Sequence, residues 1–256
     1  MLSNLLLLCF IGHISGDFYL SKDPVNGKIN KFSKLLVHTG VYIIPFIILF
    51  LLFGRSYGLF MVFLWICTAH FLIDLVGFFI SKSRFTKKLN SKSNQCGLAN
   101  YAIDEFLHIL FTLLIGIYFS NPTFNIISVP FINDFLKVVN LDLTRALKWV
   151  LLVLCIYKPV NITFVKAFSH YKPLEKEESV DVKKAGAVIG FLERFLIIIF
   201  INIQQYSAIG LILTAKSIAR YDSISKSQDF AEYYLIGTLS SLLSAILLYI
   251  IIFRHL

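Results

Sequence analysis

The chain has 256 residues, of which 57% are hydrophobic and only 15% are charged, and its mean hydropathy is +0.75. A soluble domain carries about 25% charged residues, so this composition excludes an ordinary water-soluble protein. The net charge of +9 suits basic loops beside a bilayer, and it requires no nucleic-acid partner. We therefore predict an all-α, polytopic transmembrane helical bundle whose main partner is the lipid bilayer.

The apolar residues come in long runs. A spanning helix needs about 20 of them, because the hydrocarbon layer is about 30 Å thick and each residue rises about 1.5 Å. Seven segments are candidates. Five meet the requirement, namely Leu35–Phe53, Leu59–Ile80, Tyr101–Phe119, Ala187–Thr214 and Phe230–Phe253. The weaker two are Ala146–Val165 and Leu5–Leu20, and the latter lacks the basic start and cleavage site of a signal peptide, so we expect it to be retained.

The spans predict three parts. Residues 1–120 form a four-helix membrane unit, residues 121–184 contain a loop, the fifth span and a polar cytoplasmic hinge, and residues 185–256 form a two-helix membrane unit. The loop is expected to contain an interfacial helix near Val129–Val139. Pro159 interrupts the fifth span, where the missing backbone N–H should kink the helix.

Basic residues gather in alternate loops. The rich loops contain Lys22, Lys28, Lys31 and Lys34, then Lys82, Arg84, Lys87, Lys88 and Lys92, then Lys166, Lys172, Lys176, Lys183 and Lys184. The loops between them hold only Arg55, and then Lys137, Arg145 and Lys148. Because basic loops stay in the cytoplasm, we expect the N-terminus outside and the C-terminus inside.

Histidines and aspartates recur at one spacing in the first four spans. The three pairs are His13 with Asp17 in GHISGD, His70 with Asp74 in HFLID, and Asp104 with His108 in DEFLH. Residues four apart stack on one face of a helix, so each pair can direct an imidazole and a carboxylate at the same point. A single pair of this kind is also typical of a hydrogen bond between membrane helices.

The depth of these residues favours a shared site. His13 and Asp17 end the first span, His38 opens the second, the His70 pair lies late in the third, and the Asp104 pair opens the fourth. Successive spans run in opposite directions, so all seven residues are expected at the cytoplasmic side. Four imidazoles and three carboxylates suit zinc, manganese or iron better than magnesium, and we predict one or two such ions.

Four short motifs resemble a known family. GHISGDF, LLVHT, HFLID and DEFLH follow one another as in the bacterial membrane proteins catalogued as domain of unknown function 3307. The likeness continues through FLERFLI, LTAKSIARY and EYYLIGTLSS, and in all covers about residues 5–120 and 185–245. It implies a protein of the bacterial cytoplasmic membrane with this polar constellation, but no particular reaction. Members are loosely similar to membrane-bound metal-dependent hydrolases.

Other charged residues lie at span boundaries. Glu193 and Arg194 open the sixth span on the cytoplasmic side, and they suit either a structural ion pair or a catalytic base beside an arginine that binds phosphate. Lys158 can reach an anionic headgroup or extend to the interface. On one continuous helix Lys216 would lie about 34 Å from Glu193, at the opposite face of the membrane together with Arg220 and Glu232. If the span is broken, these residues could instead join the histidines and aspartates at the cytoplasmic side.

Three functions fit these patterns. The first is a metal-dependent hydrolase acting at the cytoplasmic face on a lipid or lipid-linked substrate, at a phosphoester or phosphoanhydride bond. The seven candidate ligands favour the hydrolase, because they are more than one transport site requires. Its candidate catalytic residues are Glu193, Lys158 and Arg194. The second is a divalent-metal transporter, although a transport site belongs nearer the midplane. The third is a non-catalytic membrane component with a structural metal or polar network.

Overall fold

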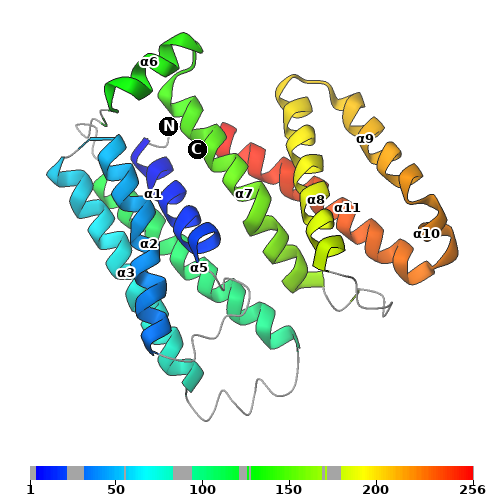
Figure 1. Cartoon of the computed structure of the whole chain (residues 1–256), viewed down its shortest axis with the longest axis horizontal. Helices are drawn as coiled ribbons and strands as arrows, with labels where there is room; N and C mark the ends of the chain where they lie inside the picture. The colour runs from blue at the N-terminus through cyan, green and yellow to red at the C-terminus, as the bar shows by residue number, and fades with distance from the viewer. Residues whose placement is uncertain are drawn as a thin grey trace. The chain divides into compact units, whose positions relative to one another are not determined.

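The structure, a computed structural model, describes residues 4–21, 32–54, 56–82, 94–120, 126, 128–168, 171 and 180–255. All the secondary structure in these residues is helical (Figure 1). Five helices are long and apolar enough to cross a membrane, namely α2 (Phe32–Leu52), α3 (Tyr57–Lys82), α5 (Asn94–Phe119), α7 (Leu143–Phe168) and α11 (Gln228–Ile250). The predicted all-α membrane class is confirmed, and the chain is an integral membrane protein.

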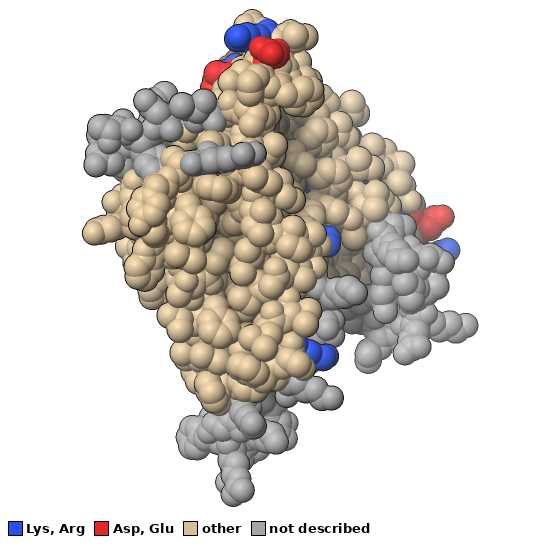
Figure 2. Space-filling view, turned by 60° about the vertical axis from the view of Figure 1, so that its left-hand side comes forward, with Lys and Arg blue, Asp and Glu red and all other residues tan. Residues whose placement is uncertain are grey.

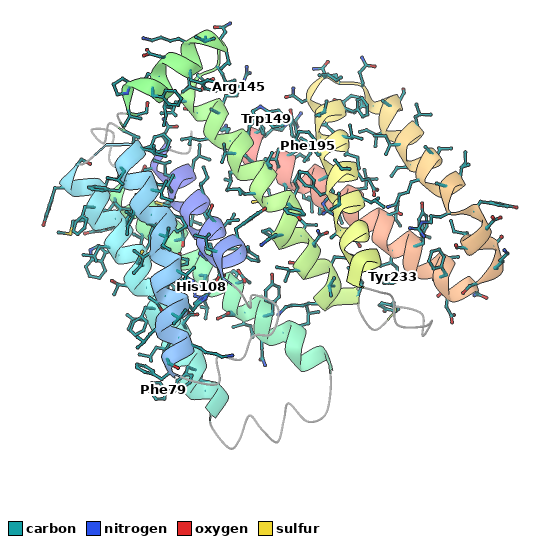
Figure 3. The ribbon with its side chains drawn as sticks, in the orientation of Figure 1. Phe79, His108, Arg145, Trp149, Phe195 and Tyr233 are labelled. Carbon is teal, nitrogen blue, oxygen red and sulfur yellow. The ribbon has the colours of Figure 1, made fainter. Side chains whose placement is uncertain are left out.

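Large apolar side chains face outward on the spanning helices. Val37 is 66% exposed and Phe79, labelled in Figure 3, is 61% exposed. Charged side chains are few on the face shown in Figure 2, which is mostly tan. Exposed apolar surface of this extent is unfavourable in water but not in lipid, because the lipid tails are equally apolar.

The chain forms two compact units, Met1–Leu151 and Leu152–Leu256, so the predicted middle part, residues 121–184, is shared between them. In the first unit α1 (Asn4–Ile14) packs against α2 and α5, and α3 packs against α2 and α5 as well. Leu7 and Leu8 of α1 are fully buried. The consecutive residues Leu5–Leu8 point to all sides of the helix and are all buried, so α1 forms the core of this unit.

Two glycines allow the first segment to lie close to α2. Gly12 faces the ring of Phe46, and a Cβ atom at Gly12 would lie 2.6 Å from that ring. Gly16 faces Tyr42, and a Cβ atom there would lie 3.0 Å from the Tyr42 carbonyl oxygen. The spacing Gly12-x-x-x-Gly16 is the small-residue pattern that permits close helix contact in membranes. Larger residues would separate α2 from α1 and from the π-helical turn η1 (Ser15–Leu20) that follows it.

The short helix expected near Val129–Val139 is α6 (Pro130–Val138). Proline at its start suits a helix N-terminus, where the amide hydrogen would have no helical partner. After its last residue, Val138, the chain turns at Asn140, which has φ 50, and Leu141 N–H bonds to Leu136 O at 3.0 Å. This is a Schellman ending with asparagine in the left-handed position. The orientation of the termini stays a prediction, and most of the basic loop residues behind it, such as Lys28 and Lys87, lie outside the described residues.

The second unit contains the rest of α7, then α8 (Val180–Asn202), α9 (Tyr206–Ala219), α10 (Tyr221–Lys226), α11 and the π-helical end η3 (Ile251–His255). Helix α8 packs against α11 and against α9. The Ser227 hydroxyl caps the start of α11 by accepting a hydrogen bond from the Phe230 amide at 3.2 Å.

The prediction of one span over Ala187–Thr214 is wrong. Helix α8 ends at Asn202, and α9 begins at Tyr206. Gln204 has φ 61, its N–H bonds Ile201 O at 3.1 Å, and Gln205 N–H bonds Phe200 O at 2.8 Å. These two bonds again form a Schellman ending, here with glutamine in place of the usual glycine.

The break brings Lys216 to Glu193. Their Nζ and Oε2 atoms are 2.6 Å apart, so the separation of about 34 Å expected for one continuous helix does not occur. Lys216 also lies over the ring of Tyr234 on α11, with Nζ 5.4 Å from its centroid. The buried Glu193 carboxylate and Lys216 thus join α8 to α9 beside α11.

Arg194 joins three helices within the second unit. Its side chain is 4% exposed. Nε donates to Ile156 O at 2.7 Å and Nη2 donates to Asn161 Oδ1 at 2.9 Å, both on α7, and Nη1 lies 3.5 Å from Ser241 Oγ on α11. Gly190, one turn earlier, leaves room for the guanidinium, because a Cβ atom there would lie 3.3 Å from Nη1.

Replacing Arg194 with lysine should destabilise the second unit. Lysine keeps the charge but cannot donate to α7 and α11 in three fixed directions, and buried charged hydrogen bonds contribute about 1.5–3 kcal/mol each. We expect Arg194→Lys to lower the free energy of unfolding by about 3 kcal/mol, measured by denaturation in detergent. Arg220→Lys, at an exposed position, is the control, and equal stability of the two variants would contradict the joining role.

Candidate metal centre

The structure brings the predicted ligands together in the first unit. His13 comes from α1, Asp17 from η1, His38 from α2, His70 and Asp74 from α3, and His108 from α5. His13, His70 and His108 are 1–3% exposed. Asp104 lies at the edge, with its side chain 49% exposed and Oδ1 3.9 Å from His108 Nδ1. Glu105 lies near His13 and Asp17 as well. We call these eight residues the His–carboxylate cluster.

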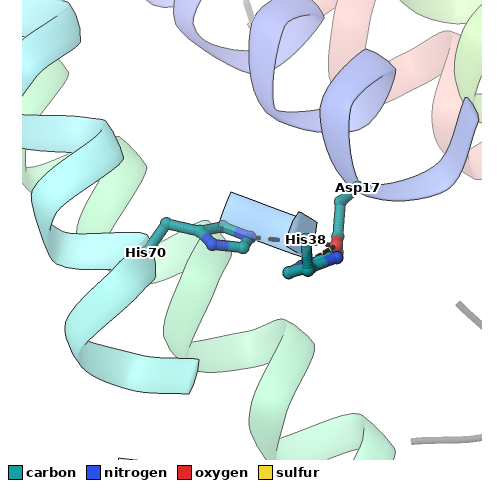
Figure 4. A group of neighbouring side chains, drawn as sticks. All are labelled: Asp17, His38 and His70. Carbon is teal, nitrogen blue, oxygen red and sulfur yellow. Dashed lines mark ion pairs between the residues drawn. The ribbon is translucent and has the colours of Figure 1, made fainter. Parts of the chain in front are cut away.

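One ligand group consists of Asp17, His38 and His70 (Figure 4). Asp17 Oδ1 is 3.4 Å from His38 Nε2 and 3.8 Å from His70 Nε2. The three side chains come from η1, α2 and α3 and converge from different directions. Each offers one atom that can coordinate an ion.

The two oxygens of Asp74 face different histidines. Its Oδ2 atom is 3.4 Å from His38 Nε2 and 3.2 Å from His70 Nδ1. Its other oxygen, Oδ1, is 3.6 Å from His108 Nε2. The second ligand group is His70, Asp74 and His108. A carboxylate whose two oxygens face different imidazoles has the arrangement of a bridge between two neighbouring ions.

The separations suit coordination better than hydrogen bonding. Ligand atoms about 2.0–2.1 Å from a tetrahedral zinc ion lie about 3.3 Å from one another. A hydrogen bond to nitrogen spans about 2.7–3.2 Å, which is shorter than five of the six imidazole–carboxylate distances in the cluster. The sixth, between His70 and Asp74, does not have the angles of a hydrogen bond.

Several buried polar atoms of the cluster have no hydrogen-bond partner among the described residues. They are His13 Nε2, both ring nitrogens of His70, Asp74 Oδ2 and both ring nitrogens of His108. Buried side-chain polar atoms normally have a partner, and each one without costs about 1–3 kcal/mol. Six such atoms in one place fit a set of metal ligands.

Two residues outside the predicted set orient the histidines. The Tyr42 hydroxyl lies 3.0 Å from His13 Nδ1, and the Ser21 hydroxyl lies 3.0 Å from His38 Nδ1. When Nδ1 donates its hydrogen to these oxygens, Nε2 keeps a lone pair free for a metal. Neither residue could be found from spacing within one helix, because Tyr42 and Ser21 each contact a histidine of another segment.

Aromatic packing fixes the orientation of His70. Its ring stacks on Tyr42 with centroids 3.6 Å apart and on His108 with centroids 4.3 Å apart. An imidazole held between two rings cannot rotate freely, so both of its nitrogens stay directed at the carboxylates. The same tyrosine therefore positions two histidines, His13 through its hydroxyl and His70 through its ring.

Asp17 lies in the π-helical turn η1, where the spacing of an α-helix no longer applies. Single π-helical turns occur often at functional sites. Here the turn places Asp17 Oδ1 beside His38 and His70 of other helices. Gly16, immediately before Asp17, provides the close approach to α2 that this arrangement needs.

Glu105 is a ligand candidate that the sequence analysis missed. It forms a third group with His13 and Asp17, in which one donor atom from each residue lies within 4.8 Å of the others. The search for pairs four residues apart overlooked it because Glu105 precedes His108 by three residues. The acidic residue beside Asp104 in DEFLH was the only available signal.

The remaining predicted residues lie in the second unit. Glu193 pairs with Lys216, while Arg194 bonds to Ile156, Asn161 and Ser241. Lys158 is on α7, at the position before Pro159. These contacts suit the structural interpretation of Glu193 and Arg194, and the catalytic roles of all three stay predictions.

The fold and the cluster define an all-α integral membrane protein with histidines and carboxylates gathered between its N-terminal helices. Residues 5–136 match the family described as "Protein of unknown function (DUF3307)", and the chain belongs to this family. The match confirms the resemblance seen in the sequence and includes every residue of the His–carboxylate cluster. No curated protein and no solved structure matches the chain.

Removing either orienting hydroxyl should weaken metal binding without unfolding the protein. Tyr42→Phe keeps the stacked ring and Ser21→Ala changes one atom, but each leaves Nδ1 of a histidine without its partner. Loss of such a partner typically lowers metal affinity 10- to 100-fold, so we expect about a 10-fold loss in each variant by chelator competition. Tyr234→Phe, whose hydroxyl contacts Ser217 in the second unit, should bind metal normally. Wild-type affinity in both cluster variants would contradict the orienting role.

Proposed function

We propose that this protein is a membrane-embedded, metal-dependent hydrolase that acts on a lipid or lipid-linked, phosphorylated substrate. We place its action at the cytoplasmic face of the bacterial cytoplasmic membrane. The observation that carries the proposal is Asp74, whose two oxygens face His38 and His70 on one side and His108 on the other. Paired ions sharing a carboxylate are typical of enzymes that cleave phosphoesters.

The donor set supports zinc, manganese or iron. Imidazole nitrogen prefers these ions, whereas magnesium prefers oxygen donors. Two ions also offset the negative charge of Asp17 and Asp74, whose side chains are only 14% and 10% exposed. A charged carboxylate costs about 2.5–3.5 kcal/mol at the centre of a membrane helix, so compensation is required.

The reaction proposed is hydrolysis at phosphorus. Ions held by the histidines and carboxylates of the cluster would lower the pKa of a water molecule to near 7 and would neutralise the phosphate oxygens. The water oxygen bonds to phosphorus, the bond from phosphorus to the lipid oxygen breaks, and a water proton passes to that leaving oxygen. His38 and Asp17, with side chains 16% and 14% exposed, and the more exposed Asp104 form the side of the cluster that a substrate can approach.

The surroundings of the cluster suit a lipid substrate. Its helices carry exposed apolar side chains on their outer faces, including Val76 and Phe79 on α3 beyond Asp74. Lys82, Arg84, Lys87 and Lys88 follow in the sequence and would attract an anionic headgroup. The proposal does not require Glu193 or Arg194, whose side chains already have partners within the second unit, and the role of Lys158 in that unit stays a prediction.

Asp74→Asn should remove the paired ions. The amide keeps the size of the side chain but cannot bridge two cations. We expect about two equivalents of tightly bound zinc, manganese or iron in wild-type protein, measured by mass spectrometry after detergent purification without chelator, and at most about one in the variant. Asp134→Asn is the control, because that carboxylate is 73% exposed on α6. Folded wild-type protein without stoichiometric metal would contradict the proposal.

The same preparations test the reaction. Phosphate release from lipid phosphates should fall by at least about 100-fold in Asp74→Asn relative to wild type. Metal-loaded protein that instead moves zinc or manganese across a liposome membrane, without hydrolysis, would favour the divalent-metal transporter. A variant that loses both metal and folded structure, in a protein with neither activity, would favour a structural metal.

A further inference from the structure

The third ligand group lies beside the proposed pair of ions and is not needed to hold them, except for the shared Asp17. It consists of His13, Asp17 and Glu105, with one donor atom from each within 4.8 Å of the others. We propose that these residues bind a third divalent ion, and that this ion is held more weakly than the other two. The proposal rests on the metal centre of the proposed function and extends it.

His13 supplies the first observation. The residue is 1% exposed, and its Nδ1 lies 3.0 Å from the Tyr42 hydroxyl. Its Nε2 is buried and has no hydrogen-bond partner among the described residues. A nitrogen oriented by one partner and unpaired at the other end is the usual state of a histidine prepared for a metal.

Glu105 supplies the second observation. It follows Asp104 on α5, and successive residues of an α-helix project about 100° apart. This rotation explains why two adjacent carboxylates reach different groups, Asp104 toward His108 on its own helix and Glu105 toward His13 and Asp17. Glu105 is only half-buried, so a third ion can exchange with solvent more easily than the pair.

Asp17 links the third ion to the others. Its Oδ1 faces His38 and His70, which leaves the second oxygen of the carboxylate for the third group. The third group offers one imidazole and two carboxylates, whereas the first group offers two imidazoles, His38 and His70, beside Asp17. Fewer nitrogen donors predict lower affinity for zinc. A phosphate oxygen of the substrate would complete its coordination.

Zinc titration of chelator-stripped protein in detergent tests this inference. Isothermal calorimetry with wild-type protein should resolve about two tight equivalents and about one weaker equivalent, separated by 10-fold or more in affinity. Glu105→Gln should lose the weaker class and keep the tight one. Glu232→Gln makes the same change at an exposed residue of α11 and should bind as wild type.

The possible results separate the two proposals. Two tight equivalents in both wild type and Glu105→Gln, with no weaker class, would overturn the third ion and leave the pair intact. No binding by folded wild-type protein would overturn both proposals. Loss of the tight class in Glu105→Gln would show that Glu105 belongs to the pair, which also overturns a separate third position. His13→Gln provides a second test, since it should lose the same weaker class.

Discussion

The structure of the first unit depends on one constraint: the negative charge of carboxylates inside a bundle of membrane helices has to be compensated. Asp17 and Asp74 are nearly buried, so little water can solvate their charge. The surrounding structure can be understood from this constraint. The apolar α1 is buried in the bundle, and its last turn carries His13 into the interior. Gly12 and Gly16 allow α2 to pack closely against this segment. Tyr42 and Ser21 orient the imidazoles that face the carboxylates. The helices thus position the imidazole and carboxylate atoms at separations that suit the coordination of cations.

The second unit meets the same constraint by a different solution. Arg194 is as deeply buried as the histidines of the cluster, yet each of its three nitrogens has an acceptor in the protein, and Glu193 has Lys216. Among the described residues of that unit, only Glu193 Oε1 is a buried side-chain atom without a hydrogen-bond partner, whereas the cluster has six such ring or carboxylate atoms. This contrast within one chain supports the view that the cluster binds something other than itself, because the same fold satisfies its buried polar groups where no ligand is expected.

Much of the fold could be predicted because long apolar runs dominate the sequence, and α2, α3, α5 and α11 follow them closely. The histidine–aspartate spacing likewise indicated the site. The break after Asn202 could not be predicted, because Gln204 adopts a left-handed conformation that glutamine rarely takes, and residues 203–205 include no glycine or proline. Tyr42, Ser21 and Glu105 were missed because their roles depend on contacts between helices. The position of Asp17 depends on a π-helical turn, to which the residue spacing of an α-helix does not apply.

The contacts of Arg194 also constrain the order in which the second unit assembles. Its acceptors Ile156 and Asn161 precede it by 38 and 33 residues, whereas Ser241 follows it by 47 residues. During synthesis the arginine reaches the membrane after α7 is made and before α11 exists. Pairing of α7 with α8 is therefore the first step that shields this charge, and α11 completes the enclosure. Helix α11 therefore completes the unit, and a chain truncated before Ser241 would leave Arg194 Nη1 without its acceptor on that helix.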